Sequence, residues 1–213
     1  MNFFNLHTHT FTSNPAITEM VNQYPWEFDA SIPKYSIGIH PWHINKDRLE
    51  SDLQTITSKL SSTSCLAVGE CGLDKRSVVP MDLQIAVFEK QIALAEQFQK
   101  PLILHLVAAF DELIIIKNRL KISVPIIIHG FSKSEQLAQK LIDSNFYLSF
   151  GKYLLRNPQV EDVFKTVPND RFFLETDTIT ETLQDVYLLA AHIKKMTLSE
   201  MQYQIKTNWE KLF

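Results

Sequence analysis

The sequence predicts an α/β fold built around a parallel sheet, and three observations support this prediction. Short, nearly continuous apolar stretches alternate with stretches that have the apolar spacing of amphipathic helices, as in βαβ units. The 213 residues include only five glycines, which is few for a sandwich or barrel that turns through tight hairpins. No repeat, charge block or linker rich in Pro, Gly and Ser interrupts the chain. We therefore expect one domain that spans residues 1–213.

The strands are predicted at apolar stretches that suit a sheet covered on both faces. Seven stretches are clear, at residues 3–9, 35–40, 65–70, 102–106, 125–129, 146–150 and 172–176, and residues 16–23 are a weaker candidate for an eighth. The interval between Thr10 and Tyr35 is too short for a full helix–strand–helix passage. Because a (β/α)8 barrel typically has about 250 residues, a barrel here would be trimmed early in the chain. An open, doubly wound sheet is also compatible with the length.

The helices are predicted from their apolar spacing and from their start signals. Residues 81–99 follow Pro80 and place apolar side chains on one face. Residues 132–135 and 197–200 both have the pattern of a capping box, in which Ser or Thr precedes Glu by three positions. Asn157 followed by proline is a further helix start.

Composition excludes several classes of function. The net charge of −3 provides no general basic field for nucleic acid, so any such substrate must be recognised at a local site. No apolar run approaches the roughly 18 residues that span a bilayer, and the first residues lack the basic region of a signal peptide. Cys65 and Cys71 are too few for a disulfide framework and lack CxxC spacing. We expect two reduced thiols in a cytoplasmic protein, with no membrane and no obligate protein partner.

Ionisable residues gather at the ends of the predicted strands. Because strand side chains alternate, His7 and His9 share a face, and so do Glu175 and Asp177. The carboxyl ends of parallel strands converge on the active site, where imidazole and carboxylate groups together suit a metal ion of the first transition row. Burying so many polar groups without compensation would be costly. The set comprises His7, His9, His40, Glu70, His105, His129, Glu175 and Asp177.

Other polar and aromatic residues are assigned to simpler roles. His43 follows His40 in a loop and His192 lies within a predicted helix, so both are expected at the surface or in packing. Trp26 and Trp209 are expected to pack. Trp42 has two interpretations, as a packing residue or as part of the lining of a substrate cleft.

Six motifs, taken in order along the chain, resemble the signatures of TatD-type metal-dependent hydrolases of the TatD DNase family. They are His7-Thr8-His9, Gly38-Ile39-His40-Pro41, Gly69-Glu70-Cys71-Gly72-Leu73-Asp74, Leu104-His105, His129-Gly130-Phe131-Ser132 and Glu175-Thr176-Asp177. The resemblance implies a single metallohydrolase domain with a TIM-type (β/α)8 barrel, trimmed in its first βα units. It further implies one or two divalent metal ions, for which the mixed nitrogen and oxygen donors suit Zn, Mn, Fe or Ni, and Mg less well.

The resemblance also implies roles for individual residues. His7, His9, Glu70 and Asp177 would hold one metal ion, and Glu70, His105 and His129 would hold a second, with Glu70 bridging the two. Such a pair supplies hydroxide near neutral pH. Asp177 would act as the general base for cleavage of phosphodiester bonds of DNA. His40 would contact the phosphate of the substrate.

Two departures from the family pattern affect the expected substrate. Asn5 stands where family members usually carry Asp, and Val107 stands where they often carry an Arg that would grip a phosphate. Lys75 and Lys133 are predicted to bind substrate in place of that Arg. Lys152 and Arg156 are further candidates.

Three functional hypotheses remain open at this point. The chain is a metal-dependent deoxyribonuclease, a metallohydrolase of a small ester, lactone or amide, or a metal-binding protein without catalysis. Residues 5–10 also resemble the opening of PHP-type phosphoesterases, but the Asp-x-His close of that family is missing, because Ile179 follows Asp177-Thr178.

Overall fold

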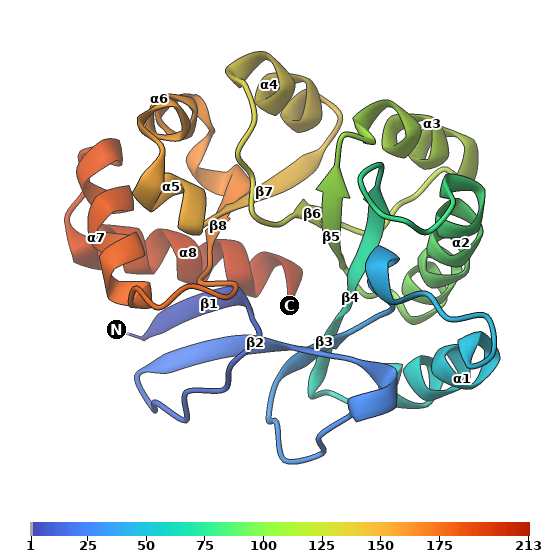
Figure 1. Cartoon of the computed structure of the whole chain (residues 1–213). Helices are drawn as coiled ribbons and strands as arrows, with labels where there is room; N and C mark the ends of the chain where they lie inside the picture. Colours follow the sequence, from blue (N-terminus) through green and yellow to red (C-terminus); the bar gives the residue numbers. More distant parts are fainter. Residues whose placement is uncertain (1) are drawn as a thin grey trace. The chain divides into compact units, whose positions relative to one another are not determined.

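The computed structural model describes residues 2–213, in which strands and helices alternate (Figure 1). The strands are β1 (Phe3–Thr8), β2 (Ile17–Gln23), β3 (Tyr35–Ile37), β4 (Cys65–Asp74), β5 (Leu102–Val107), β6 (Ile126–Ile128), β7 (Phe146–Phe150) and β8 (Phe172–Leu174). The α-helices are α1 (Leu49–Leu60), α2 (Met81–Phe98), α3 (Phe110–Leu120), α4 (Glu135–Asp143), α5 (Lys152–Arg156), α6 (Pro158–Thr166), α7 (Leu183–Lys194) and α8 (Leu198–Leu212). The strands follow one another in chain order, β1 to β8, and every pairing with a defined register is parallel.

This topology is that of the predicted (β/α)8 class, trimmed in its first two units. The weaker eighth strand is present as β2, one residue shorter than predicted. Among the described residues, the β1–β2 connection holds no helix, and the β2–β3 connection holds only a short 3-10 helix, Pro25–Glu27. From β3 onward each strand is followed by at least one α-helix, so the missing length lies where the sequence predicts it.

The chain divides into two compact units. The first contains residues up to Val21 together with Ile127–Phe213. In this unit β1 pairs with β2, β7 pairs with β8, and an isolated bridge between Thr8 and Asp177 links the ends of β1 and β8. Trp209 of α8 packs on Phe4 of β1, as the sequence predicts for this tryptophan. The Tyr187 hydroxyl of α7 bonds both the N–H and the C=O of Phe4 and thereby fixes α7 to β1.

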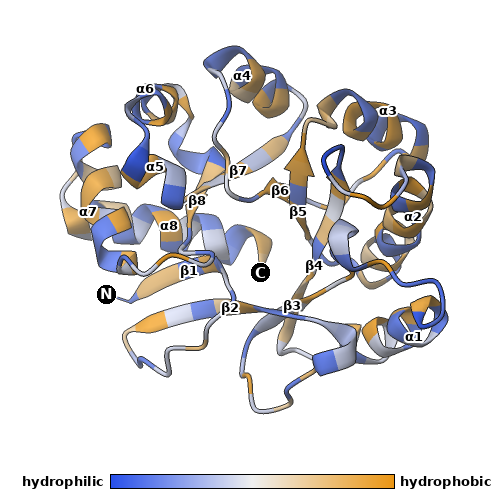
Figure 2. Cartoon of the chain, viewed as in Figure 1, coloured by the Kyte–Doolittle hydropathy of each residue, from blue (hydrophilic) through white to orange (hydrophobic). Residues whose placement is uncertain are grey.

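The second unit, Asn22–Ile126, is built on β3, β4 and β5 with α1 to α3. β4 is central to these three strands and all ten of its residues are buried. Two glutamines of α2 reach the ends of these strands. The Gln91 side chain hydrogen-bonds to the N–H and C=O of Ile39, two residues after β3, and the Gln84 side chain hydrogen-bonds to the N–H and C=O of Asp74, the last residue of β4. Figure 2 shows that β5 and β6 are mainly apolar, whereas α1 and α4 carry apolar and polar residues together.

Several predicted boundaries need correction. β3 ends at Ile37 and β8 at Leu174, so His40 and Glu175 lie just beyond their strands, whereas β4 continues four residues past Glu70. The capping box predicted at residues 132–135 is wrong, because α4 begins at Glu135 and Ser134 is its N-cap. The capping box of α8 and the Asn157 cap of α6 are confirmed. No described helix is long and apolar enough to cross a membrane.

Candidate metal centre

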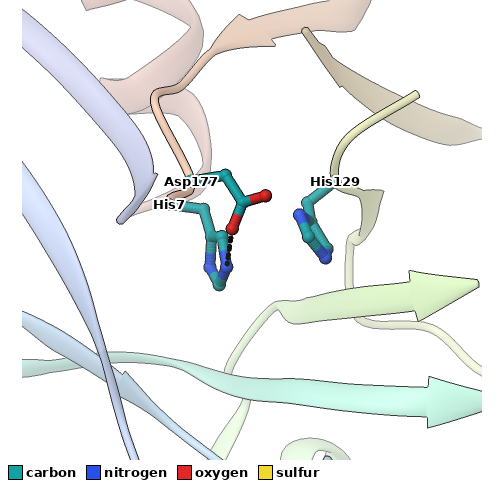
Figure 3. A group of neighbouring side chains, drawn as sticks. All are labelled: His7, His129 and Asp177. Atoms are coloured by element: carbon teal, nitrogen blue, oxygen red, sulfur yellow. Dashed lines mark ion pairs between the residues drawn. The ribbon is translucent and has the colours of Figure 1, made fainter. Parts of the chain in front are cut away.

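A group of three potential metal ligands forms in the first unit from three different elements. His7 lies on β1, His129 directly follows β6, and Asp177 follows β8. One donor atom from each lies within 4.8 Å of the others, and Figure 3 shows the side chains close together. Asp177 Oδ1 lies 3.8 Å from His7 Nε2 and 3.5 Å from His9 Nε2, so His9 also joins this neighbourhood. Two or three imidazoles around a carboxylate suit a divalent transition metal.

The backbone around Asp177 explains how this carboxylate reaches the group. The Asp177 N–H donates to the His7 carbonyl at 2.9 Å, and the His9 N–H donates to the Asp177 carbonyl at 3.2 Å. Asp177 has a φ of 54°, a left-handed conformation that Asp and Asn tolerate better than most residues. These two hydrogen bonds to the end of β1 therefore set the position of Asp177, and the left-handed turn redirects the chain at that point.

Asn5 supports the same segment. Its side-chain amide donates to Thr176 Oγ1 at 2.8 Å, and its side-chain oxygen accepts from the Thr176 N–H at 3.0 Å. Thr176 lies between Glu175 and Asp177, so this two-point contact fixes the backbone that carries both carboxylates. The departure from the family's Asp thus removes a charge but keeps a buried hydrogen-bonding side chain at this position.

Glu175 is a second carboxylate of this unit for which the sequence indicated no individual role. Its Oε1 accepts from the Gly130 N–H at 2.7 Å and lies 3.5 Å from His129 Nδ1. Burial alone would raise the pKa of Glu175, but hydrogen bonding to His129 and the charges of His129 and His7 bring the pKa below its ordinary value. A buried carboxylate beside a ligand imidazole fixes the orientation and tautomer of that ring.

A second group of ligands, His40, Glu70 and His105, forms within the second unit, again with donor atoms within 4.8 Å. Glu70 Oε1 lies 3.3 Å from His40 Nε2 and 3.2 Å from His105 Nδ1. The Glu70 N–H donates to Asn22 Oδ1 at 2.7 Å, which holds the backbone of the central residue. Burial lowers the pKa of His40 despite the nearby carboxylate, which favours its neutral imidazole.

Asp74 contacts His105 of this second group, and no role was predicted for it from the sequence. Its Oδ2 lies 2.9 Å from His105 Nε2 and accepts from the Trp42 indole N–H at 2.7 Å. Its Oδ1 accepts from the Arg76 N–H at 2.7 Å. Burial would raise the pKa of Asp74, but these hydrogen bonds lower it below its usual value. The signal was present in the Gly-Leu-Asp motif, whose Asp lies four residues after Glu70.

The predicted substrate-binding residues occupy different environments. His40 is buried beside Glu70, as described above. Lys75 lies next to Val107, whose carbonyl accepts from the Lys75 N–H at 3.1 Å, and its ammonium pairs with Glu112 at 2.6 Å. Lys133 is exposed in the segment before α4. The Arg156 guanidinium forms a bidentate ion pair with the Glu181 carboxylate.

Comparison with known proteins gives a consistent result. A family described as "TatD related DNase" matches residues 2–213. YabD of Bacillus subtilis, named an uncharacterized metal-dependent hydrolase, is 32% identical over 93% of this chain and 83% of its own. A TATDN1 homologue of Enterocytozoon bieneusi, named provisionally as a deoxyribonuclease, is 29% identical over 83% of this chain and 75% of its own.

Two solved structures share the fold. The TatD homologue YJJV of Escherichia coli has a TM-score of 0.84 at 20% identity, covering 99% of this chain and 97% of that one. A TatD family hydrolase of Entamoeba histolytica has a TM-score of 0.84 at 14% identity, covering 100% and 98%. These similarities confirm the predicted fold class.

Proposed function

The chain belongs to the TatD related DNase family of metal-dependent hydrolases, and from this premise we propose that it cleaves phosphodiester bonds of DNA. The observation that carries the proposal is the pair of histidine–carboxylate groups, one in each unit, built from the motif residues. The PHP-type interpretation is set aside by the family match. Glu70 and Asp177 are the two carboxylates for which we propose catalytic roles.

The donor set fits one or two divalent metal ions. His7, His9, His129 and Asp177 come from the first unit, and His105 and Glu70 come from the second. A divalent ion in such surroundings lowers the pKa of a bound water and stabilises negative charge that develops on a phosphoryl oxygen. The imidazoles would bind in their neutral form, and the carboxylates would offset the positive charge of the metal.

We propose that Asp177 accepts the proton of the attacking water. Its side chain is 25% exposed, whereas the Glu70 side chain is 4% exposed. A general base must release the proton it has taken before the next turnover, and the partly open carboxylate can release it to solvent. Glu70 is better suited to remain a fixed ligand.

Recognition of the phosphate is assigned to His40, Lys75 and Lys133. The support for Lys75 is its position beside Val107, where the family Arg would otherwise lie. Its ammonium pairs with Glu112, and a substrate phosphate would compete with that carboxylate for it.

The test is an assay of a labelled single-stranded DNA with each candidate metal, with and without chelator. The matched variants are Asp177→Asn, which removes the proposed base, and Asp162→Asn, which alters an exposed residue of α6. We expect metal-dependent cleavage by the wild type and by Asp162→Asn. Absence of metal-dependent cleavage above the Asp177→Asn level would refute the proposal.

A second candidate function is hydrolysis of a small ester, lactone or amide. Two observations favour it: the apolar Val107 replaces the phosphate-binding Arg, and Lys75 is already engaged by Glu112. A panel of carbonyl substrates distinguishes the two candidates, because turnover of model phosphodiesters without any carbonyl substrate counts against this one. Bound metal by elemental analysis, with no hydrolysis of either class, would instead indicate a metal-binding protein without catalysis.

A further inference from the structure

Trp42 is an exposed aromatic side chain beside the second ligand group. It lies in the short 3-10 helix Pro41–His43, directly after His40, and is 56% exposed. Its ring centroid lies 4.9 Å from that of His40 and 5.3 Å from that of His105. A single exposed apolar residue is common on protein surfaces and does not by itself indicate a binding site. Trp42 is notable because it lies beside two candidate site imidazoles.

The Trp42 ring is also held in a fixed position. Its indole N–H donates to Asp74 Oδ2 at 2.7 Å, and its backbone N–H donates to His40 Nδ1 at 3.1 Å. Asp74 is itself buried and held through its backbone by Gln84. An exposed ring that is anchored by its polar edge presents its apolar surface without losing conformational freedom on binding.

The rings of the other two tryptophans pack against residues of the chain itself. Trp26 stacks on Tyr24, with ring centroids 4.8 Å apart, and the Arg48 guanidinium lies 3.8 Å from the centre of its ring. Trp209 is buried against Phe4 and Phe213. Trp42 differs from both because more than half of it is open to solvent while its N–H is satisfied.

We propose that Trp42 is a stacking platform for a planar ring of the substrate, namely the nucleobase next to the scissile phosphodiester. This inference rests on the DNA substrate proposed above. Base stacking on an aromatic side chain is independent of sequence, because every base has a flat π surface. Asp74 Oδ2 contacts both the Trp42 N–H and the His105 ring, so the platform and a proposed metal ligand share one anchor.

The experiment compares two single-stranded substrates of the same length and charge. One is oligothymidylate and the other has the same phosphodiester backbone made wholly of abasic tetrahydrofuran units. Because every position is abasic, the comparison does not depend on where the chain is cut. We expect the wild type to have a KM about tenfold lower for oligothymidylate, a factor within the usual range for stacking on one aromatic residue.

Two substitutions separate stacking from the hydrogen bond to Asp74. Trp42→Ala removes both, and we expect the difference in KM between the substrates to disappear. Trp42→Phe keeps a flat ring but loses the N–H, and we expect it to retain most of the difference. Tyr203→Ala, which removes an exposed aromatic residue from α8, is the matched control and should behave as the wild type.

A binding measurement keeps this inference distinct from the DNA-cleavage proposal. Fluorescence anisotropy of the two labelled oligonucleotides with metal-free protein measures affinity for the bases without any turnover. Loss of the oligothymidylate preference in Trp42→Ala supports the platform even if no DNA is cleaved. Equal affinity of the wild type for the two oligonucleotides, or an unchanged preference in Trp42→Ala, would overturn it.

Discussion

The two ligand groups hold their carboxylates in different ways. Glu70, in the second unit, is buried, lies 3.2–3.3 Å from two imidazole nitrogens, and has its backbone fixed by Asn22. Asp177, in the first unit, lies beyond its strand in a left-handed conformation, is partly exposed, and lies 3.5–3.8 Å from its imidazoles. A carboxylate among imidazoles thus appears once in a buried, closely held form and once in a partly exposed form.

The difference suits two different tasks for the two carboxylates in the function proposed above. A buried, tightly held carboxylate keeps its charge and position through a reaction cycle, as a ligand must. A carboxylate with access to solvent can accept a proton and release it. We therefore expect substitutions at the two positions to affect different measurements, and the predictions below test that division from the largest expected effect to the smallest.

The largest effect is expected for Asp177→Asn. Asn adopts the left-handed conformation as readily as Asp, so the backbone at this position is preserved. Loss of the proposed base should lower kcat by about 10²–10⁴-fold on the substrate that the wild type turns over. Metal content after dialysis, measured by elemental analysis, should fall less than in Glu70→Gln. If kcat and metal content fell together in proportion, Asp177 would be a ligand only.

Glu70→Gln should instead act mainly on metal binding. The amide carries no charge to offset the metal, so affinity measured by competition with a chromogenic chelator should fall by at least about tenfold. Because Glu70 is proposed to bridge, the stoichiometry of bound metal should fall at both sites, whereas His129→Ala should empty mainly one. An unchanged stoichiometry in Glu70→Gln would show that the bridging assignment is wrong. His192→Ala, on the exposed face of α7, is the control.

Asp74→Asn tests the support beneath the second group. An acceptor that fixes the ring of a ligand histidine typically contributes about 10–100-fold to metal affinity. Trp42 Nε1 and His105 Nε2 both contact Oδ2, so an Asn oxygen at that position keeps both partners without the negative charge, while its NH2 group faces the Arg76 N–H, and we expect a loss near the lower end of that range. Chelator competition measures the loss, with Asp162→Asn as the matched surface substitution. Full affinity in Asp74→Asn would mean that the negative charge of Asp74 is not needed to fix the His105 ring.

The sequence predicts roles for Asp177 and Glu70, whereas it assigns none to Asp74. His7, Glu70, His105 and Asp177 follow from apolar strands that end in ionisable residues. Asp74 was missed because β4 was expected to end at Glu70. In fact β4 continues beside β5, where a Cβ on Gly72 would lie 2.1 Å from the His105 carbonyl oxygen, so only glycine allows this approach.

The same limit applies to the contacts made by individual side chains. Sequence placed Trp42 beside His40 but left two roles open for it, because its anchor depends on how far β4 runs. It placed Lys75 near the missing Arg but not its partner Glu112, which comes from α3. Strand identity is a local property of the chain, whereas side-chain pairing depends on the register between strands.

The smallest effects are expected at Asn5, which positions the open carboxylate without touching it. Asn5→Ala leaves the Thr176 N–H without its acceptor, and we expect the free energy of unfolding to fall by about 1–3 kcal/mol. Asn5→Asp retains an acceptor for that N–H, so thermal denaturation should show a smaller loss. Both variants should lower kcat more than they lower metal affinity, because the segment they loosen carries Asp177. If metal affinity fell more than kcat in Asn5→Ala, the first group would depend on rigidity as much as the second does, and the contrast between closed and open carboxylates would not hold.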